Sequence, residues 1–382
     1  MEVSTGRSVQ TTHDFTIDII GLGQIRLADS PIPLEIIDLE HSEPRFTDSV
    51  IQDSLEPFLP DTDPVVTNVD NPLLRLKIHL SSSSSIIGVA WHHTLGDAAT
   101  LLRFMIALSD GYQGLTSDSS THPTFRKYHF PEPDQMKISK WLPHMSHLAH
   151  TYPASEIGAK YTEGGEVIVP IRAIIRRTDA DALRKKMHSM LDINSKVQLS
   201  IQDCLTATIV TTINSVQPNT VQKVTNVAGF RQVTATWNDS NIAGNSIYIV
   251  STPALDPERS CDPTQIARII RESLLATRTA EYVEEYMSVA GHKMALAAES
   301  ERHFFFGSER NTISVNSNMA LHWQKADFGC PATRFFTATI TRFYMRVFPA
   351  NTGEAIDLTF GAPESLRQDI IQRLGPEFMI VQ

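Results

Sequence analysis

The residues best suited to chemistry are two adjacent histidines, His92 and His93, and an aspartate four positions after the second, Asp97. The apolar run before them predicts a strand, in which successive side chains point to opposite faces. One ring should therefore face a cleft while the other packs into the fold, which argues against a paired-histidine metal site. A neutral imidazole in a cleft can accept a proton from an alcohol or an amine near pH 7.

A strand, a turn and a helix must position these residues. Residues Ile86–Trp91 form the predicted strand, and apolar side chains then recur at helical spacing over Ala98–Leu108, where Gly111 ends the pattern. Gly96 suits the turn between them. Residues Leu74–Leu80 alternate between apolar and polar, and a run of five serines joins them to the next strand, which predicts a β-hairpin. Strand ends are where α/β proteins place their chemistry.

A second candidate motif follows much later, at Asp327, Phe328 and Gly329. A protein-kinase interpretation of Asp-Phe-Gly fails, because no glycine-rich loop, VAIK-like lysine or HRD-like loop accompanies it. The next residue, Cys330, is more readily explained as a small filler than as a nucleophile. No Ser-His or Cys-His pairing indicates a covalent intermediate.

Together the two motifs resemble a known family. His92–Ala98, HHTLGDA, resembles the HHxxxDG signature of the chloramphenicol-acetyltransferase-like superfamily. Ala326–Pro331, ADFGCP, resembles the DFGWG motif of the BAHD acyltransferases within that superfamily. The order and the separation of the motifs also match. The chain departs from the pattern at Ala98, Cys330 and Pro331, and it is closer to the fungal secondary-metabolism branch than to the plant enzymes.

The resemblance implies an α/β fold of two chloramphenicol-acetyltransferase-like domains, each a mixed β-sheet with flanking helices, and an active-site channel at their interface. We expect residues 1–165 to form the N-terminal domain with HHxxxD, and residues 166–382 to form the C-terminal domain with DFG. Gly6-Arg7 and the strand predicted at Phe15–Ile20 match a point after the family's first strand and helix. On this match the chain lacks the family's opening segment.

The resemblance also implies roles for individual residues. On this resemblance His93 is the general base, and Asp97 pairs with Arg231 to hold the loop. Asn316 or Ser317 either donates a hydrogen bond to the oxyanion or has a role in a turn. A further set has supporting roles: Gly244, Asn245 and Ser246 match an element near the acyl-carrier channel, and Asp327, Phe328 and Gly329 shape that channel.

Composition narrows the function classes. The 382-residue chain has a formal net charge of −10, which disfavours nucleic acid as a partner. Its three cysteines are widely spaced and form no CxxC motif, so we expect a reduced intracellular protein without a structural zinc. We expect no metal cofactor. The N-terminus lacks an apolar signal region, and no apolar run is long enough to span a bilayer. We expect a monomeric cytoplasmic protein.

The sequence therefore predicts an acyltransferase that moves an acyl group from acyl-coenzyme A directly to a hydroxyl, or less readily an amine, of a small secondary metabolite. Two alternatives stay open: a stand-alone condensation-type domain with a carrier-bound donor, and a diverged member that binds or cyclises a metabolite. The basic pairs Arg176-Arg177 and Lys185-Lys186 are candidates for coenzyme A phosphates, although a solvated face is the favoured explanation.

The rest of the chain gives a coarse outline. Prolines interrupt residues 115–168, which predicts helix fragments in a long crossover. Ser200 can cap a helix that ends at Val216. A helix is also expected over Asp48–Leu59, and a single long one over Pro263–Gly291. The remaining expected elements are strands at Leu34–Leu39, Val167–Ile175, Val224–Phe230, Ile247–Val250, Thr312–Val315, Thr337–Phe348 and Ala355–Leu358, and helices at Ala182–Leu191 and Pro363–Leu374.

Overall fold

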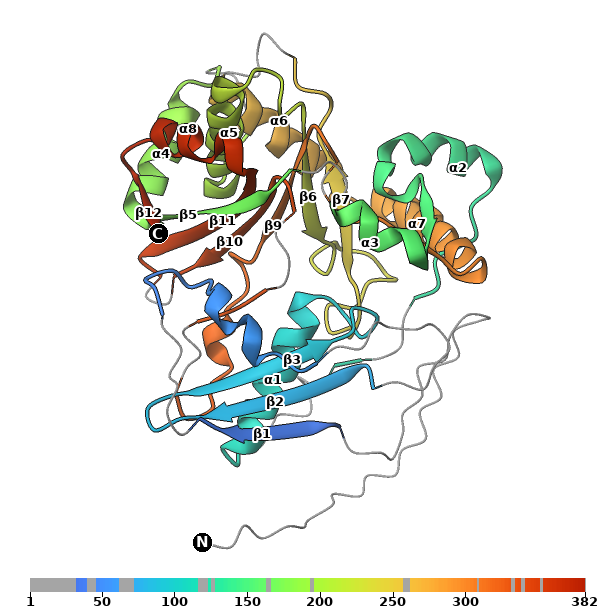
Figure 1. Cartoon of the computed structure of the whole chain (residues 1–382). Helices are drawn as coiled ribbons and strands as arrows, with labels where there is room; N and C mark the ends of the chain where they lie inside the picture. The colour runs from blue at the N-terminus through green and yellow to red at the C-terminus, as the bar shows by residue number, and fades with distance from the viewer. Residues whose placement is uncertain are drawn as a thin grey trace, which may run out of the picture.

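Figure 1 shows the computed structural model of the chain. It describes residues 32–39, 46–61, 72–115, 123–124, 128–162, 166–192, 196–256, 262–307, 309–330, 334–337, 341–350 and 353–381. The predicted strand Phe15–Ile20, the Gly6-Arg7 match and Cys261 lie outside the described residues. The described chain forms a small lobe and a large lobe, with the small lobe at the bottom of the view.

The small lobe is a three-stranded mixed sheet with one long helix. Strands β1 (Leu34–Asp38), β2 (Leu74–Leu80) and β3 (Ser85–Trp91) lie in the order β1-β2-β3. β1 runs parallel to β2, and the predicted β2–β3 hairpin is antiparallel with Leu74 opposite Trp91. Helix α1 (Ala98–Tyr112) follows β3 and buries Leu102 and Met105.

The large lobe contains a seven-stranded mixed sheet in the order β12-β5-β11-β10-β9-β6-β7. Only the β9–β10 and β6–β9 pairs are parallel. The last strand along the chain, β12, was not expected from the sequence. The strands are β5 (Ile168–Arg176), β6 (Lys223–Gly229), β7 (Ile247–Ser251), β9 (Thr312–Ser317), β10 (Tyr344–Pro349), β11 (Ala355–Pro363) and β12 (Phe378–Val381).

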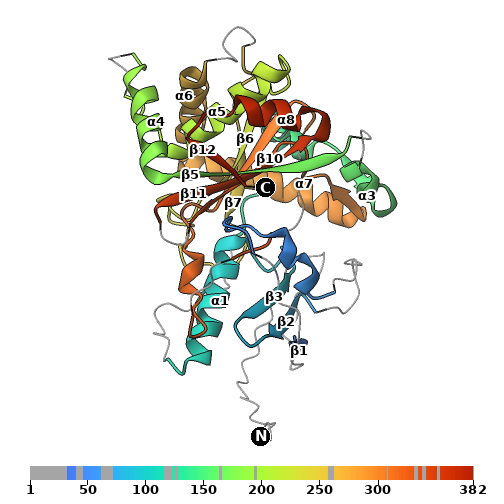
Figure 2. The ribbon, with the colours of Figure 1, turned by 60° about the vertical axis from the view of Figure 1, so that its left-hand side comes forward.

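Helices cover the face of this sheet that lies away from the small lobe (Figure 2). They are α4 (Arg177–Ser189), α5 (Ile201–Val216), α6 (Pro263–Ala276) and α8 (Glu364–Arg373). α5 is the central one, and ten of its sixteen residues are buried. Its N-terminus carries a capping box in which Ser200 and Asp203 each accept the other's backbone N–H. Burial of this apolar face is the main favourable term for the lobe.

The opposite face of the sheet is polar and meets the small lobe. Arg346 and Asp357, on neighbouring strands, are only 2% and 1% exposed. The Asp357 carboxylate accepts the backbone N–H of Val50 at 2.5 Å and the hydroxyl of Ser49. Residues just beyond Val50 form η1 (Asp53–Phe58), which packs on β2 and β3. The two lobes are therefore joined by buried hydrogen bonds.

The crossover contains the helix fragments that the prolines predict, and it packs on the large lobe. Its strand β4 (Thr151–Pro153) pairs with β8 (Arg302–Phe304). Its helix α2 (Gln135–Trp141) packs on α7 (Ala280–Glu299). These contacts link the two sides of the predicted boundary at 165, and the division into domains stays a prediction. The other crossover elements are η3 (Leu142–His144), η4 (Ser146–Leu148) and α3 (Ala154–Thr162).

Three expected elements differ from those in the structure. The single helix over Pro263–Gly291 is wrong, because the chain turns after α6 and Thr279 starts α7 by accepting the backbone N–H of Tyr282. Part of the strand expected over Thr337–Phe348, residues 338–340, lies outside the described residues. In the described part β10 starts at Tyr344, directly after Phe343, which has a φ of +50°. The helix over Asp48–Leu59 is only the 3-10 turn η1. None of the helices in the described ranges is both long and apolar enough to cross a bilayer.

The packing of η4 against α7 predicts a pH dependence of stability. Nε2 of His147 lies 3.2 Å from the Tyr286 hydroxyl, and burial, with a smaller contribution from the charge of Lys223, lowers the pKa of His147 from 6.5 to about 4. Between these values the unfolded state binds the proton, so the free energy of unfolding falls as the pH falls, by up to about 3 kcal/mol. Urea denaturation at about pH 7 and about pH 5 should show about 2 kcal/mol of this loss, because pH 5 still lies above the folded-state pKa of about 4.

The variant His147→Gln should show a smaller loss over that range than the unchanged protein. His150→Gln, at an exposed position, is the matched control and should keep the full loss. If His147→Gln and the unchanged protein lost the same free energy of unfolding between pH 7 and pH 5, His147 would be excluded as the source of the pH dependence.

Candidate active site

The loop between β3 and α1 carries the histidines and is fixed at both ends. Trp91, the last residue of β3, donates its indole N–H to the carbonyl of Gly96 at 2.8 Å. Asp97 caps α1 by accepting the backbone N–H of Thr100 at 3.1 Å. Asp97 therefore serves as an N-cap, a position at which a carboxylate is favoured.

Both histidines lie beyond the end of β3. The alternation of side chains along a strand therefore does not set their directions, contrary to the prediction from the sequence. His93 is exposed, whereas His92 is half-buried and its Nδ1 accepts the backbone N–H of Thr94 at 3.2 Å. Burial, with a smaller contribution from His93, lowers the pKa of His92. The two side chains differ in environment because of the turn.

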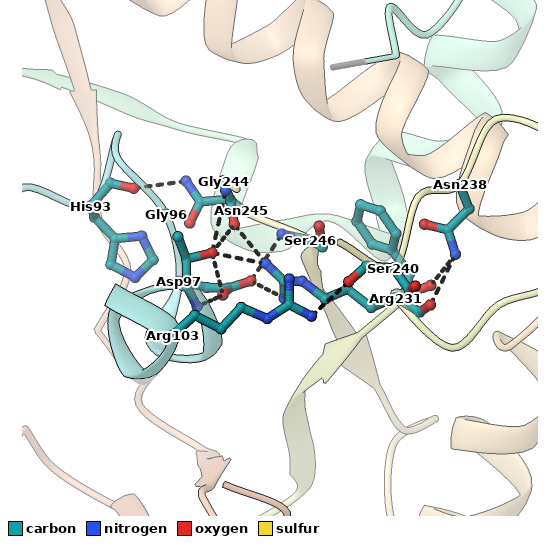
Figure 3. Close-up of polar contacts among 12 residues, drawn as sticks. His93, Gly96, Asp97, Arg103, Arg231, Asn238, Ser240, Gly244, Asn245 and Ser246 are labelled. Carbon is teal, nitrogen blue, oxygen red and sulfur yellow. Dashed lines mark hydrogen bonds and ion pairs between the residues drawn. The ribbon is translucent and has the colours of Figure 1, made fainter. Parts of the chain in front are cut away.

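Asp97 is the centre of a buried network that joins the lobes (Figure 3). Its side chain is 4% exposed, and its Oδ2 accepts Nη1 of Arg231 at 2.7 Å and the backbone N–H of Ser246 at 3.0 Å. Burial by itself would raise the pKa of the Asp97 carboxyl. The hydrogen bonds from Arg231, Ser246 and Thr100 and the charge of Arg231 outweigh it, so the pKa lies below its usual value.

The segment Gly244–Ser246 enters the same network from the large lobe. The carbonyl of Gly244 accepts Nη2 of Arg231 at 2.8 Å and the hydroxyl of Thr100 at 2.9 Å. Asn245 donates its side-chain N–H to the backbone carbonyl of His93 at 2.8 Å. The structure thus brings the predicted coenzyme-binding segment against the histidine loop.

The imidazole of His93 takes no part in these contacts. Figure 3 shows its backbone carbonyl held by Asn245 while the ring stays outside the network. Among the described residues the ring has no hydrogen-bond partner, and it is exposed at the junction of the lobes. A ring that is exposed on a fixed backbone can meet a substrate hydroxyl and accept its proton.

The backbone of Gly96 predicts the effect of a substitution. Gly96 has a φ of +154°, and an added Cβ would lie 2.6 Å from Cβ of Thr100. Gly96→Ala should lower the free energy of unfolding by about 1–3 kcal/mol and should also reduce turnover, because the same turn carries His93. Urea denaturation and initial rates measure the two effects.

Gly111→Ala is the matched control, since Gly111 lies inside α1 with no atom within 4 Å of an added Cβ. It should stabilise the protein by about 0.5–1 kcal/mol. If Gly96→Ala were as stable as this control, the turn would not require glycine.

The two residues proposed for the oxyanion lie on β9, on the large lobe. Asn316 donates its side-chain N–H to the Tyr344 hydroxyl at 2.9 Å, and the hydroxyl of Ser317 accepts the backbone N–H of Met319 at 3.4 Å. No hydrogen bond joins either side chain to His93 or Asp97. Their roles stay predictions.

The Asp327–Gly329 turn contacts the far end of α1. The backbone carbonyl of Asp327 accepts the side chain of Gln113, and the ring of Phe328 lies 5.8 Å from that of Tyr112. Because α1 rises about 1.5 Å per residue, this contact is about 20 Å from the N-cap Asp97. The turn therefore contacts the small lobe far from His93, and its role in shaping the channel stays a prediction.

The described residues show how possible metal ligands and two of the three cysteines are placed. Among the described residues, no three His, Cys, Asp or Glu side chains are grouped to hold a metal ion. Cys330 is exposed, whereas Cys204 is buried and burial raises the pKa of its thiol to about 12.

His93 does not line either of two cavities on the described part of the chain. One of about 430 Å³ lies beside β12, between Phe46–Asp48 and Met379–Val381. The other, of about 400 Å³, lies beside the end of β6 and the start of α7. The predicted channel between the lobes stays a prediction.

Comparison with solved structures identifies the fold. TRI101 of F. sporotrichioides, in complex with coenzyme A and T-2, has a TM-score of 0.70 and 14% identity over 94% of this chain and 83% of that chain. The chain has the fold of TRI101. TRI101 of F. graminearum, in complex with ethyl coenzyme A, has a TM-score of 0.69 and 13% identity, over 94% of this chain and 83% of that chain. Vinorine synthase has a TM-score of 0.58 and 17% identity, over 89% of this chain and 74% of that chain. No protein-family model and no curated protein sequence matches the chain.

This TRI101-like fold is the fold class that the sequence resemblance predicted. The two lobes and their sheets are present, and the histidine loop lies at their junction. Several supporting residues were not predicted from the sequence, because their side chains bind backbone carbonyls and such contacts leave no sequence motif. Asn238 holds the Arg231 loop by donating to the carbonyls of Phe230 and Val233, and Arg103 donates to the carbonyl of Ser240. Thr100 could have been found, since it is the third residue of a capped helix.

Proposed function

We propose that this protein is a BAHD-type acyltransferase that transfers an acyl group from acyl-coenzyme A to a hydroxyl of a small metabolite. The observation that carries the proposal is the Asp97–Arg231 pair, which locks a loop of one lobe onto the other while leaving the His93 ring exposed at the junction. Similar folds add support, because TRI101 binds coenzyme A and T-2.

In this mechanism a neutral ring nitrogen of His93 accepts the proton of the acceptor hydroxyl. The hydroxyl oxygen forms a bond to the thioester carbonyl carbon, and the carbonyl electrons move to oxygen. Asn316 or Ser317 stabilises this oxyanion, a contribution of about 3 kcal/mol for one donor. The C–S bond then breaks and the imidazolium returns the proton to sulfur, which releases free coenzyme A. No covalent enzyme intermediate is formed.

The supporting residues have separate tasks in this proposal. Asp97 and Arg231 keep the histidine loop in place and do not touch the reacting atoms. Gly244, Asn245 and Ser246 line the path of the coenzyme A arm toward His93. An amine can replace the hydroxyl, since its lone pair attacks the same carbon and its proton passes to the same ring.

The assay is release of free thiol from acetyl-coenzyme A by the full chain with a panel of small alcohols, with product mass measured in parallel. We expect thiol release that depends on the alcohol and an ester that carries the acyl group. Transfer from a carrier-bound acyl group alone would contradict the coenzyme A assignment. Product formation without any acyl donor would contradict acyl transfer.

A further inference from the structure

Polar side chains form a row across the face of the large sheet that meets the small lobe. The pairing of the strands places Arg346 of β10 beside Asn316 of β9 and Thr359 of β11. It also places Thr359 beside Arg172 of β5. Side chains at paired positions lie on the same face of a sheet. Arg172 forms an ion pair with Asp53 of η1, so the row lies between the lobes.

Arg346 is the most deeply buried cation of this row, because it is only 2% exposed. Its Nη1 donates to the backbone carbonyl of Thr337 at 2.5 Å and to the hydroxyl of the same residue. Its Nε and Nη2 are also buried, and they have no hydrogen-bond partner among the described residues. These two N–H groups lie on one edge of the planar guanidinium and point in the same direction.

The nearby carboxylates do not bind this edge. Asp53 is paired with Arg172, and Oδ2 of Asp357 accepts two donors from the small lobe. In the described part of the chain no ion pair joins either carboxylate to Arg346. Buried N–H groups of a cation are costly to leave unpaired. The free edge of Arg346 matches a carboxylate, whose two oxygens accept two parallel N–H groups.

The row begins at the residue that we assign to the oxyanion. Asn316 donates to the Tyr344 hydroxyl at 2.9 Å, and Arg346 lies opposite Asn316 in the register of β9 and β10. The segment Gly244–Ser246, which we assign to the arm of the donor, leads into β7. In the sheet β6 and β7 lie on one side of β9, and β10 lies on the other. With the thioester at Asn316, the side of Arg346 is therefore left for the acceptor.

We infer that the acceptor is a hydroxy acid, and that the Nε–Nη2 edge of Arg346 binds its carboxylate. Thr359 can add a donor, since its hydroxyl is fully buried and has no partner among the described residues. The inference rests on the proposed function for acyl transfer and adds the class of acceptor to it. A phosphate is less suited, because its second negative charge would be repelled by the buried carboxyl group of Asp357 on the next strand.

The test uses pairs of alcohols that differ only in the anionic group: lactate and lactamide, mandelate and mandelamide, and 4-hydroxybenzoate and 4-hydroxybenzamide. With acetyl-coenzyme A, kcat/KM for at least one acid should exceed that for its amide by about 10- to 100-fold, the gain from a charge-assisted pair. Arg346→Met should remove this preference while kcat/KM for the amide and KM for acetyl-coenzyme A stay unchanged. Arg346→Lys should keep only part of it, since lysine has the charge without the planar fork.

Arg367→Met is the matched control. Arg367 is a half-buried arginine of α8, which covers the other face of the sheet (Figure 2), and its substitution should leave the preference intact. Binding is measured separately from turnover by the Tm of each protein with each acid and amide. An acid that binds should raise the Tm of the unchanged protein and of Arg367→Met, and it should not raise that of Arg346→Met.

The absence of any preference for an acid, in both rate and Tm, would overturn the inference and leave ordered water as the partner of Arg346. A preference for succinyl-coenzyme A over acetyl-coenzyme A that depends on Arg346, with none among the alcohols, would also overturn it, because the carboxylate would then belong to the acyl group. If amides are acetylated as fast as acids, the proposed function stands and this inference fails. If acids raise the Tm through Arg346 but no acyl group is transferred, the carboxylate site stands and the proposed function fails.

Discussion

Replacing His93 with alanine should lower kcat for acyl transfer by about 100- to 10,000-fold, because proton transfer by a positioned base contributes that much to the rate. KM for the acyl donor should stay close to its original value, since only the backbone carbonyl of His93 is held by Asn245 and alanine keeps that carbonyl. Initial rates of thiol release at saturating donor measure the loss.

His150→Ala is the control for this experiment. Both histidines are exposed, and both substitutions remove an imidazole from the surface. His150 lies between η4 and β4, outside the loop that precedes α1. It should keep full activity, and both variants should unfold at the temperature of the unchanged protein. A His93→Ala protein that transfers acyl groups at the original rate would rule out His93 as the general base.

Replacing Asp97 with alanine should destabilise the protein by about 3–5 kcal/mol, because it leaves the guanidinium of Arg231 buried without its carboxylate. The Arg231 side chain is only 12% exposed, so water replaces little of the lost interaction. The backbone N–H groups of Thr100 and Ser246 lose an acceptor as well. Urea denaturation measures the loss of stability, and kcat should fall with it because Asp97 starts the helix that follows the histidine loop.

A double-mutant cycle separates the ion pair from the cap. Asp97→Ala, Arg231→Met and the double variant should give a coupling energy of about 1 kcal/mol or more, because the two groups are in direct contact. The double variant should be more stable than Asp97→Ala, since it no longer buries an unpaired charge. Additive effects would show that the two side chains do not depend on each other.

Local features of the candidate site follow from short stretches of sequence. The end of β3, the turn at Gly96 and the start of α1 could be predicted because each depends on neighbouring residues. Apolar alternation or helical spacing makes the strand and the helix, and a carboxylate stabilises the first N–H groups of the helix. Ser200 before α5 was predictable on the same ground, and its capping box is present.

Features that depend on distant residues were not accessible in this way. The break between α6 and α7 was missed because apolar spacing continues through it, and only the cap at Thr279 marks the second start. Likewise β12 is short, and it is a strand because β5 offers it a free edge. The polar face of the large sheet could not be distinguished from a solvated one without its partner residues Ser49 and Val50.

The sequence by itself determined that a histidine stands at the end of a strand, four residues before a helix-capping aspartate. The family resemblance suggested Arg231, 134 residues away, as the partner of that aspartate, but only the tertiary structure decided the distance and the burial of the pair. It also decided that Asn245 holds the histidine backbone from the other lobe. The physical reason is that the strength of an ion pair or a hydrogen bond depends on distance and burial, which spacing along a chain does not specify.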